Sequence, residues 1–237
     1  MNLSTPIEKI PRIGPFYQKK LKKLGVKTIR DLFYHFPHRY EDFSNLVSIS
    51  KAKVGEKVCI QGKISEIKNI KIWGRRMFLT QAFIQDKTGE LKIIWFNQPY
   101  LVNTFKEGDS VCLAGKISLS KATKKSNPEP YLTSPIYEKI GQKEELTHVG
   151  RLVPLYPETV GLSSRWIRYM IKPLLIGLKD ELQDPLPKEI QEKEKFLPLK
   201  EALFQIHFPK TMELAKEARA RFAFEETFKI ALWALKE

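Results

Sequence analysis

The sequence predicts an α+β protein in which a five-stranded β-barrel lies between two helical segments. Residues 53–140 carry short runs of β-branched and aromatic residues separated by turns, which is typical of strands. Before and after this region, apolar residues recur at helical spacing. With 237 residues, 42% of them hydrophobic, the chain has enough apolar material to bury a core. We therefore expect a helical amino-terminal unit at 1–52, a barrel at 53–140 and a helical linker at 141–237.

The order of the predicted strands identifies the kind of barrel. The strand-like runs lie at 58–67, 77–84, 91–96, 110–119 and 131–140. A turn at Asp86-Lys87-Thr88-Gly89 makes a hairpin of the second and third, and a short helix is expected at 98–106. The resulting order, β-β-β-α-β-β, is that of the OB barrel. Residues 54–65 also align without gaps with 107–118, which we attribute to two barrel strands under the same constraints rather than to duplication.

The amino-terminal unit is expected to contain two helices within 6–36, with Thr28 as the N-cap of the second and Asp31 completing a weak capping box. The lead-in at 10–15 resembles the turn of helix-hairpin-helix DNA-binding units, where glycines let backbone N–H groups approach phosphate. Here Arg12 replaces the first glycine. A helical pair that only packs on its neighbour is an equally good interpretation.

After the barrel, helices are predicted at about 164–177 and from about 210 to the last residue. The second one has no cap or stop signal, so we expect the chain to be a piece of a longer protein.

Charge and cysteine content narrow the class of partner and the compartment. The chain has 41 Lys and Arg against 27 Asp and Glu, a formal net charge of +14. Such a surface favours a polyanion, although charge alone leaves DNA, RNA and anionic lipid open. Two cysteines are too few for a disulfide framework, and the sequence has neither a signal peptide nor an apolar run of about 18 residues. We expect a cytoplasmic protein with no membrane partner.

Several catalytic classes have no signature in the sequence. No G-x-x-x-x-G-K-[ST] string occurs, so we expect no ATP hydrolysis by this chain alone. The four histidines show no metal-ligand spacing, and neither G-x-S-x-G nor H-E-x-x-H appears. We therefore predict no catalytic residue, cofactor or metal in this chain.

Two basic loops are candidates for nucleic-acid binding, because OB barrels bind through the loops between strands 1–2 and 4–5. Basic and aromatic side chains gather in both. They are Lys71, Trp73, Arg75 and Arg76 in the first loop and Lys121, Lys124 and Lys125 in the second. Cations neutralise phosphates and an indole stacks on unpaired bases. The alternative is a pair of solvated loops, but their expected position at one end of the barrel favours binding.

The third strand ends in an unusual aromatic cluster. Trp95 and Phe96 are adjacent, so one of them must point away from the core of a strand that alternates inward and outward. Tyr100 follows four residues later. The pattern alone favours Phe96 and Tyr100 as core residues at the base of the barrel, with an exposed rim that stacks on bases as the alternative.

Motifs along nearly the whole chain resemble the RecG family, bacterial ATP-dependent helicases of branched DNA. The resemblance rests on segments that occur in the family's order. They are Ile13-Gly14-Pro15, Leu24-Gly25-Val26-Lys27-Thr28-Ile29-Arg30-Asp31-Leu32, Phe36-Pro37-His38-Arg39-Tyr40-Glu41-Asp42, Phe96-Asn97-Gln98-Pro99-Tyr100-Leu101, Tyr156-Pro157, Gly161-Leu162-Ser163, His207-Phe208-Pro209 and Ala218-Arg219-Ala220-Arg221-Phe222-Ala223-Phe224-Glu225-Glu226. Arg12 departs from the glycine that many relatives have.

This resemblance implies a wedge domain that binds replication forks or Holliday junctions and splits their arms, in DNA repair and recombination. It implies that Phe96 and Tyr100 stack at the branch point, which reverses the preference from the pattern alone. It further favours a monomer. The single-stranded-DNA-binding protein is a separate candidate partner, because its tails dock on OB surfaces. ATP and magnesium would bind motor domains that this chain lacks.

Two other classes remain. An OB module that binds a tRNA anticodon uses a similar hairpin, and an OB barrel can also serve as a protein-interaction scaffold.

Overall fold

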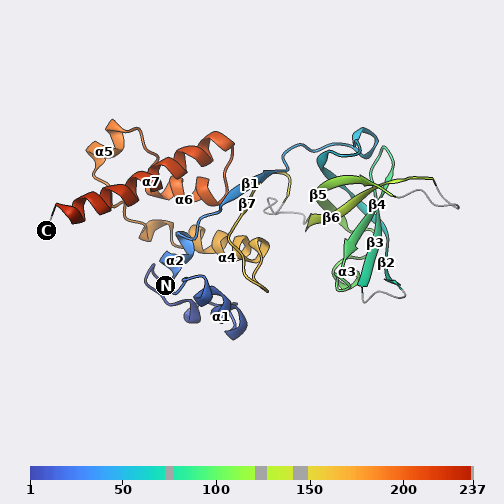
Figure 1. Cartoon of the computed structure of the whole chain (residues 1–237), viewed down its shortest axis with the longest axis horizontal. Coiled ribbons are helices and arrows are strands. Elements are labelled where there is room, and N and C mark those ends of the chain that lie inside the picture. Colours follow the sequence, from blue (N-terminus) through green and yellow to red (C-terminus); the bar gives the residue numbers. More distant parts are fainter. Residues whose placement is uncertain (73–76, 121–126, 141–148, 236–237) are drawn as a thin grey trace. The chain divides into compact units, whose positions relative to one another are not determined.

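The computed structural model describes residues 1–72, 77–120, 127–140 and 149–235. The chain divides into two units (Figure 1). One, the barrel unit, comprises Asp42–Arg151, and the other, the helical unit, comprises Met1–Glu41 together with Leu152–Glu237. The sequence predicted three consecutive parts. The two helical parts instead form one unit, because their apolar side chains share one core.

Five strands of the barrel unit close into a barrel in the spatial order β2-β3-β4-β6-β5. The strands are β2 (Lys57–Ile72), β3 (Met77–Gln85), β4 (Glu90–Phe96), β5 (Ser110–Leu119) and β6 (Pro130–Lys139). Neighbouring strands are antiparallel except β4 and β6, which are parallel. Helix α3 (Leu101–Thr104) joins β4 to β5, and a 3₁₀ turn, η2 (Ile49–Lys51), precedes β2. This topology confirms the predicted OB order.

The barrel core explains which aromatic residues turn inward. Alternate residues of β4 are buried, and the last of them is Trp95, whose indole N–H donates to the Pro135 carbonyl at 3.0 Å. Leu101 and Phe105, from α3 and its C-cap, are also buried in this core. Figure 1 shows α3 at one end of the barrel. Trp95 therefore takes the inward position, and its neighbour Phe96 takes the outward one.

The internal sequence repeat corresponds to β2 and β5, which pair with each other in the barrel. Each copy has a glycine where another strand approaches closely. A Cβ on Gly62 would lie 2.5 Å from the Gln85 carbonyl oxygen, and a Cβ on Gly115 would lie 3.2 Å from Pro135 Cα. Gly115 also lies at a register shift between β5 and β6. Close strand packing thus accounts for the repeated glycine.

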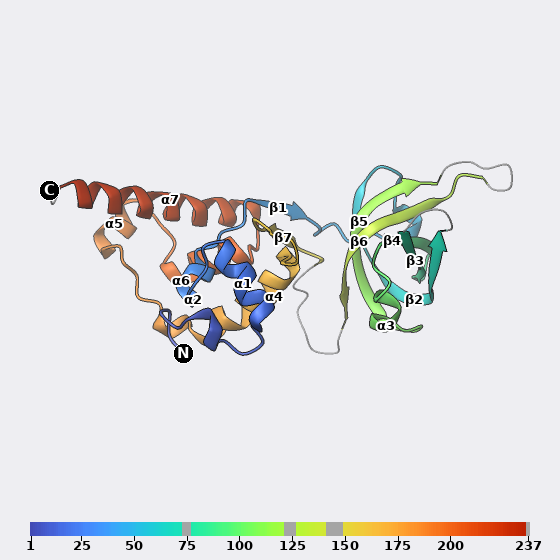
Figure 2. The ribbon, with the colours of Figure 1, turned by 60° about the horizontal axis from the view of Figure 1, so that its bottom comes forward.

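The helical unit contains most of the helices. Its elements are η1 (Ile7–Lys9), α1 (Pro15–Lys23), α2 (Ile29–Phe33), β1 (Arg39–Asp42), β7 (Leu152–Leu155), α4 (Ser164–Gly177), η3 (Lys179–Glu181), α5 (Lys188–Lys193), α6 (Leu199–His207) and α7 (Met212–Ala234). Strand β1, which ends at the boundary of the unit, pairs with β7. Figure 2 shows α7 as a long helix along this unit, next to α6. The predicted capping box is present, with the Asp31 N–H donating to Thr28 Oγ1 at 3.2 Å and the Thr28 N–H donating to the Asp31 carboxylate at 2.9 Å. No helix of the described ranges is long and apolar enough to cross a membrane.

A buried polar chain joins the two ends of the sequence in the helical unit. One ring nitrogen of His207, Nδ1, lies 2.9 Å from the Tyr156 hydroxyl, and the other, Nε2, lies 2.7 Å from the Phe33 carbonyl oxygen. A carbonyl only accepts, so Nε2 carries the proton and Nδ1 accepts from Tyr156. Burial lowers the pKa of His207 to about 4. The imidazole is therefore neutral and serves as a structural link between α2, α6 and the segment after β7.

A second buried group anchors α7. Arg221 is fully buried, and its guanidinium donates to the Leu197 carbonyl at 2.9 Å and to the Asp184 carboxylate at 2.5 Å. Two residues earlier on the helix, Arg219 donates to the Pro37 carbonyl at 2.7 Å. The motif of residues 218–226 thus has a structural role in holding α7 on the rest of the unit.

Candidate nucleic-acid interface

The outer face of β2, β3 and β4 carries an apolar row at the end where β4 stops. Ile70 on β2 lies opposite Leu79 on β3, and Leu79 lies opposite Phe96 on β4. Directly opposite residues in antiparallel strands share a face, so the three side chains form a continuous strip. Ile70 and Leu79 are half-buried and Phe96 is exposed. We call this strip the apolar row.

Phe96 and Tyr100 are both exposed, with 38% and 52% of their surface accessible. The pattern alone favoured burial of both, and that interpretation is wrong. Phe96 is at a position of β4 that points outward, because the alternate residues up to Trp95 are buried. Tyr100 follows the strand at the N-cap of α3. Asn97 makes the turn between them with a φ of +55°, and its backbone N–H donates to the Phe78 carbonyl at 2.8 Å. The turn ends the strand and brings the chain toward α3.

A hydrogen-bonded support holds residues 97–100 against the barrel. The fully buried Thr80 hydroxyl lies 2.7 Å from Asn69 Oδ1 and 2.8 Å from the Gln98 carbonyl oxygen, so its single proton bonds one of them at a time. Asn69 donates from Nδ2 to the Pro99 carbonyl at 2.9 Å. The Tyr100 hydroxyl in turn donates to Gln98 Oε1 at 3.0 Å. Strands β2 and β3 therefore fix the segment that carries the aromatic side chains.

Of the predicted basic residues, Lys71 is described. It is exposed near the end of β2, next to Ile70 of the apolar row and opposite Phe78. Its position on β2 is at the same end of the sheet as Phe96, because the β2–β3–β4 register brings these strand ends together. Lys68, three residues earlier on β2, forms an ion pair with Glu66 at 2.6 Å. Because successive side chains of a strand point to opposite faces, Lys71 shares a face with Phe78 and lies on the other face from the apolar row.

The remaining predicted residues lie outside the described ranges. They are Trp73, Arg75 and Arg76 in the first loop and Lys121, Lys124 and Lys125 in the second. The first loop follows β2, whose described end carries Lys71, and the second joins β5 to β6. Their roles therefore stay predictions.

Sequence reasoning missed three side chains at this end of the sheet. Ile70 and Leu79 belong to the apolar row, and Phe78, 42% exposed, precedes Leu79 on β3. The structure shows that the even-numbered residues Thr80, Ala82 and Ile84 are buried, so Leu79 points outward. The sequence alone did not indicate which alternate set of this strand faces the core. Apolar residues that adjoin one another on an outer face, unlike a single one, mark a candidate binding face.

The groups at this end of the sheet suit binding. Aromatic faces stack on bases, and a lysine ammonium neutralises a phosphate. The described residues contain no group of three or more His, Cys, Asp and Glu side chains arranged to hold a metal ion.

Comparison with known proteins gives a consistent result. The family model of the RecG wedge domain matches residues 6–176. The ATP-dependent DNA helicase RecG of Thermotoga maritima is 35% identical over 232 residues, which is 98% of this chain and 29% of the relative. The protein of the same name from Synechocystis sp. is 28% identical over 253 residues, again 29% of its length. The chain thus spans less than a third of the relatives that it matches.

A solved structure of RecG bound to a three-way DNA junction is similar over 96% of this chain and 30% of the solved chain, with a TM-score of 0.76 and 34% sequence identity. This similarity covers both units described above. From the family match, the close relatives and this structure we conclude that the chain belongs to the RecG wedge domain family.

Proposed function

We propose that the barrel unit binds branched DNA, such as a replication fork or Holliday junction, and separates its strands at the branch point. The observation that carries the proposal is the pair of exposed aromatic rings, Phe96 and Tyr100. Hydrogen bonds from Asn69 and from the buried Thr80 hold the segment that carries them. Rings held rigidly at the end of a sheet offer a surface on which the last base pair of an arm can stack. The similar solved protein is a RecG bound to a three-way DNA junction, which supports this choice of ligand.

In this mechanism the chain itself is passive. Phe96 and Tyr100 stack on the bases at the branch point, and Lys71 contacts a strand backbone. Trp73, Arg75 and Arg76 engage a strand leaving the junction, while Lys121, Lys124 and Lys125 add affinity that does not depend on sequence. Strand separation follows when DNA is pulled past the aromatic segment, because the two strands must pass on different sides of it.

The movement of DNA would come from motor domains. The relatives are named ATP-dependent DNA helicases, and this chain matches 29% of their length. The sequence of 237 residues has no P-loop string. We propose that ATP and magnesium are used by motor domains working with this chain as a monomer, in DNA repair and recombination, and that the single-stranded-DNA-binding protein is a further partner.

Binding of the full chain to a three-way fork and to a linear duplex of equal length tests the proposal. Electrophoretic mobility shifts at several salt concentrations separate the contribution of phosphate contacts to affinity from that of base stacking. We expect affinity for both DNAs to fall steeply with salt, and preference for the fork to persist, because stacking does not release counterions. Equal affinity for fork and duplex at every salt concentration would exclude branch-point recognition. Preference for a tRNA loop over the fork would favour the anticodon-binding alternative instead.

A further inference from the structure

The helical unit has a basic and aromatic surface of its own, formed by α1 and α4. We call it the α1–α4 surface, and it consists of Arg12, Phe16, Lys20, Lys23 and Tyr169. Phe16 and Tyr169 have 57% and 48% of their area exposed. The surface lies outside the barrel unit, so the proposed function above does not use it.

Contacts between α1 and α4 fix this surface. The rings of Tyr17 and Trp166 stack with centroids 4.2 Å apart and an interplanar angle of 16°. Arg12 donates from Nη1 to the Tyr169 hydroxyl at 3.0 Å. Phe16 lies against Gly161, where an added Cβ would come within 2.7 Å of the ring. These contacts hold Phe16 and Tyr169 in place although neither belongs to the hydrophobic core.

Each exposed ring has a cation beside it, Lys20 for Phe16 and Arg12 for Tyr169. Phe16, Lys20 and Lys23 follow one another at helical spacing, so they share a face of α1. Lys20 Nζ lies 5.4 Å from the centroid of the Phe16 ring. Residues 9–30 contain eight Lys and Arg and no acidic residue. The surface therefore combines rings and positive charge, the two features with which proteins bind unpaired nucleic acid.

Nearby carboxylates are engaged elsewhere. Glu8 forms an ion pair with Lys22, which lies on another face of α1, at 2.5 Å. Asp31 accepts from the Thr28 N–H in the capping box. On the α4 side, the Glu158 carboxylate accepts from the Ser164 N–H at 2.6 Å. None of these ion pairs or hydrogen bonds involves Arg12, Lys20 or Lys23.

The backbone at Arg12 brings its side chain to this surface. Its φ is +72°, in the left-handed region that favours glycine. A glycine would keep the turn without steric cost, but it would leave Tyr169 without the guanidinium. Arginine at this position thus adds a cation beside an exposed ring.

We infer that the α1–α4 surface is a second nucleic-acid site, at which Phe16 and Tyr169 stack on bases of a single strand while Arg12, Lys20 and Lys23 contact its phosphates. A single strand fits better than the side of a duplex, because bases inside a duplex are stacked on each other and leave no face free for a ring. An acidic protein segment would use the cations and leave the rings without a function.

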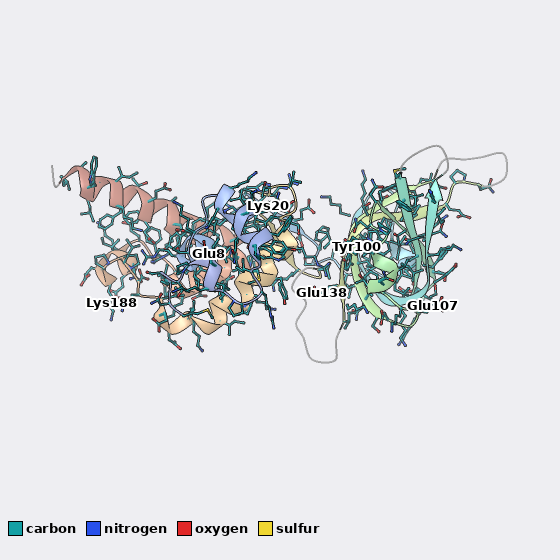
Figure 3. The ribbon with its side chains drawn as sticks, turned by 90° about the horizontal axis from the view of Figure 1, so that it is seen from below. Glu8, Lys20, Tyr100, Glu107, Glu138 and Lys188 are labelled. Carbon is teal, nitrogen blue, oxygen red and sulfur yellow. The ribbon has the colours of Figure 1, made fainter. Side chains whose placement is uncertain are left out.

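Matched lysine variants of the full chain test this site. Lys20→Gln/Lys23→Gln removes two charges from the α1–α4 surface, and Lys188→Gln/Lys193→Gln removes two from α5, which lies elsewhere on the helical unit (Figure 3). The probe is a fluorescein-labelled thymidine oligonucleotide, and its anisotropy is measured at several salt concentrations. We expect the first pair to weaken binding about three- to tenfold and to lower the salt slope by about 1, and the second to change affinity less than about twofold. Phe16→Ala is expected to weaken binding about fivefold with an unchanged salt slope, because stacking is lost without loss of charge.

The same measurements in a Phe96→Ala/Tyr100→Ala background separate this site from the barrel. If the site is independent, the effect of the α1 lysines persists whether or not the barrel binds DNA. Equal losses from the two lysine pairs would show that only net charge matters and would overturn the inference. So would losses confined to a duplex probe, or to an acidic peptide while oligonucleotide binding stays unchanged.

Discussion

Thr80→Val tests how the aromatic segment is held. Valine has nearly the shape of threonine, so the barrel core keeps its volume, but the hydroxyl between Asn69 and Gln98 is lost. The hydroxyl is fully buried, and its removal leaves the Gln98 carbonyl without that donor. A lost hydrogen bond of this kind costs about 1–2 kcal/mol. We expect the barrel to lose that much stability and the protein to lose preference for forks, because residues 97–100 are no longer fixed.

Urea unfolding followed by NMR measures the expected loss of barrel stability. The indole N–H of Trp95 is buried and bonded to Pro135, so its signal reports on the barrel unit alone. Binding of a fork and of a duplex by the same protein measures the expected loss of fork preference. Thr88→Val is the matched control, since its hydroxyl bonds Asp86 in the hairpin that follows the far end of β3. We expect the control to keep its fork preference. If Thr80→Val left both the unfolding free energy and the fork preference unchanged, the hydroxyl would not hold the segment.

Three further predictions concern the rest of the fold. Burial lowers the pKa of His207 from 6.5 to about 4, so between these two pH values only the unfolded chain binds the proton. The free energy of unfolding of the helical unit should therefore be highest above pH 6.5. It should fall between pH 6.5 and pH 4 by at most about 1.4 kcal/mol per pH unit. Urea unfolding at several pH values measures this, and a flat profile would contradict it. Asp184→Ala removes the nearer of two carboxylates that pair with buried Arg221 and leaves Glu225 at 3.9 Å. Loss of this charged hydrogen bond should cost about 2 kcal/mol in thermal or urea unfolding, and a loss below about 0.5 kcal/mol would refute that role. Cys59 and Cys112 are buried free thiols with sulfur atoms 3.0 Å apart, so a thiol reagent should react with them slowly in the native protein and rapidly in denaturant, and fast native labelling would show that they are accessible.

The barrel was largely predictable because residues close together in the sequence determine each of its elements. Strand-length apolar runs, the Asp86–Gly89 turn and the short helix after Phe96 each depend on neighbouring residues, and together they specify the OB order. Adjacency of Trp95 and Phe96 likewise required one ring to point outward. Which one does so depends on the tertiary core, where the Trp95 indole N–H bonds to Pro135.

The union of the two helical segments was not predictable from local pattern. It depends on contacts between residues far apart in the sequence, such as His207 with Phe33 and Arg219 with Pro37. His207 can be buried because it finds a partner on the other segment, and no sequence periodicity indicates such long-range pairings.

The candidate site was only partly predictable. Exposed aromatic residues were among the candidates from the sequence, but the support from Asn69 and Thr80 was not, because it depends on the β2–β3 register. The α1–α4 surface was not predictable from the sequence either, because it depends on tertiary contacts. Phe16 and Tyr169 lie more than 150 positions apart, and only the packing of α1 on α4 brings Arg12 to Tyr169.

The most direct test of the central claim is binding of a three-way fork and a linear duplex by Phe96→Ala/Tyr100→Ala. Because both rings are substantially exposed, the variant should fold, which the Trp95 indole signal checks. Leu46→Ala/Val54→Ala, which removes two other exposed apolar side chains from the barrel unit, is the control. We expect the folded Phe96→Ala/Tyr100→Ala variant to bind fork and duplex equally and weakly, while the control keeps the wild-type preference for the fork. A folded variant with undiminished fork preference would contradict the account and move branch recognition away from these two rings.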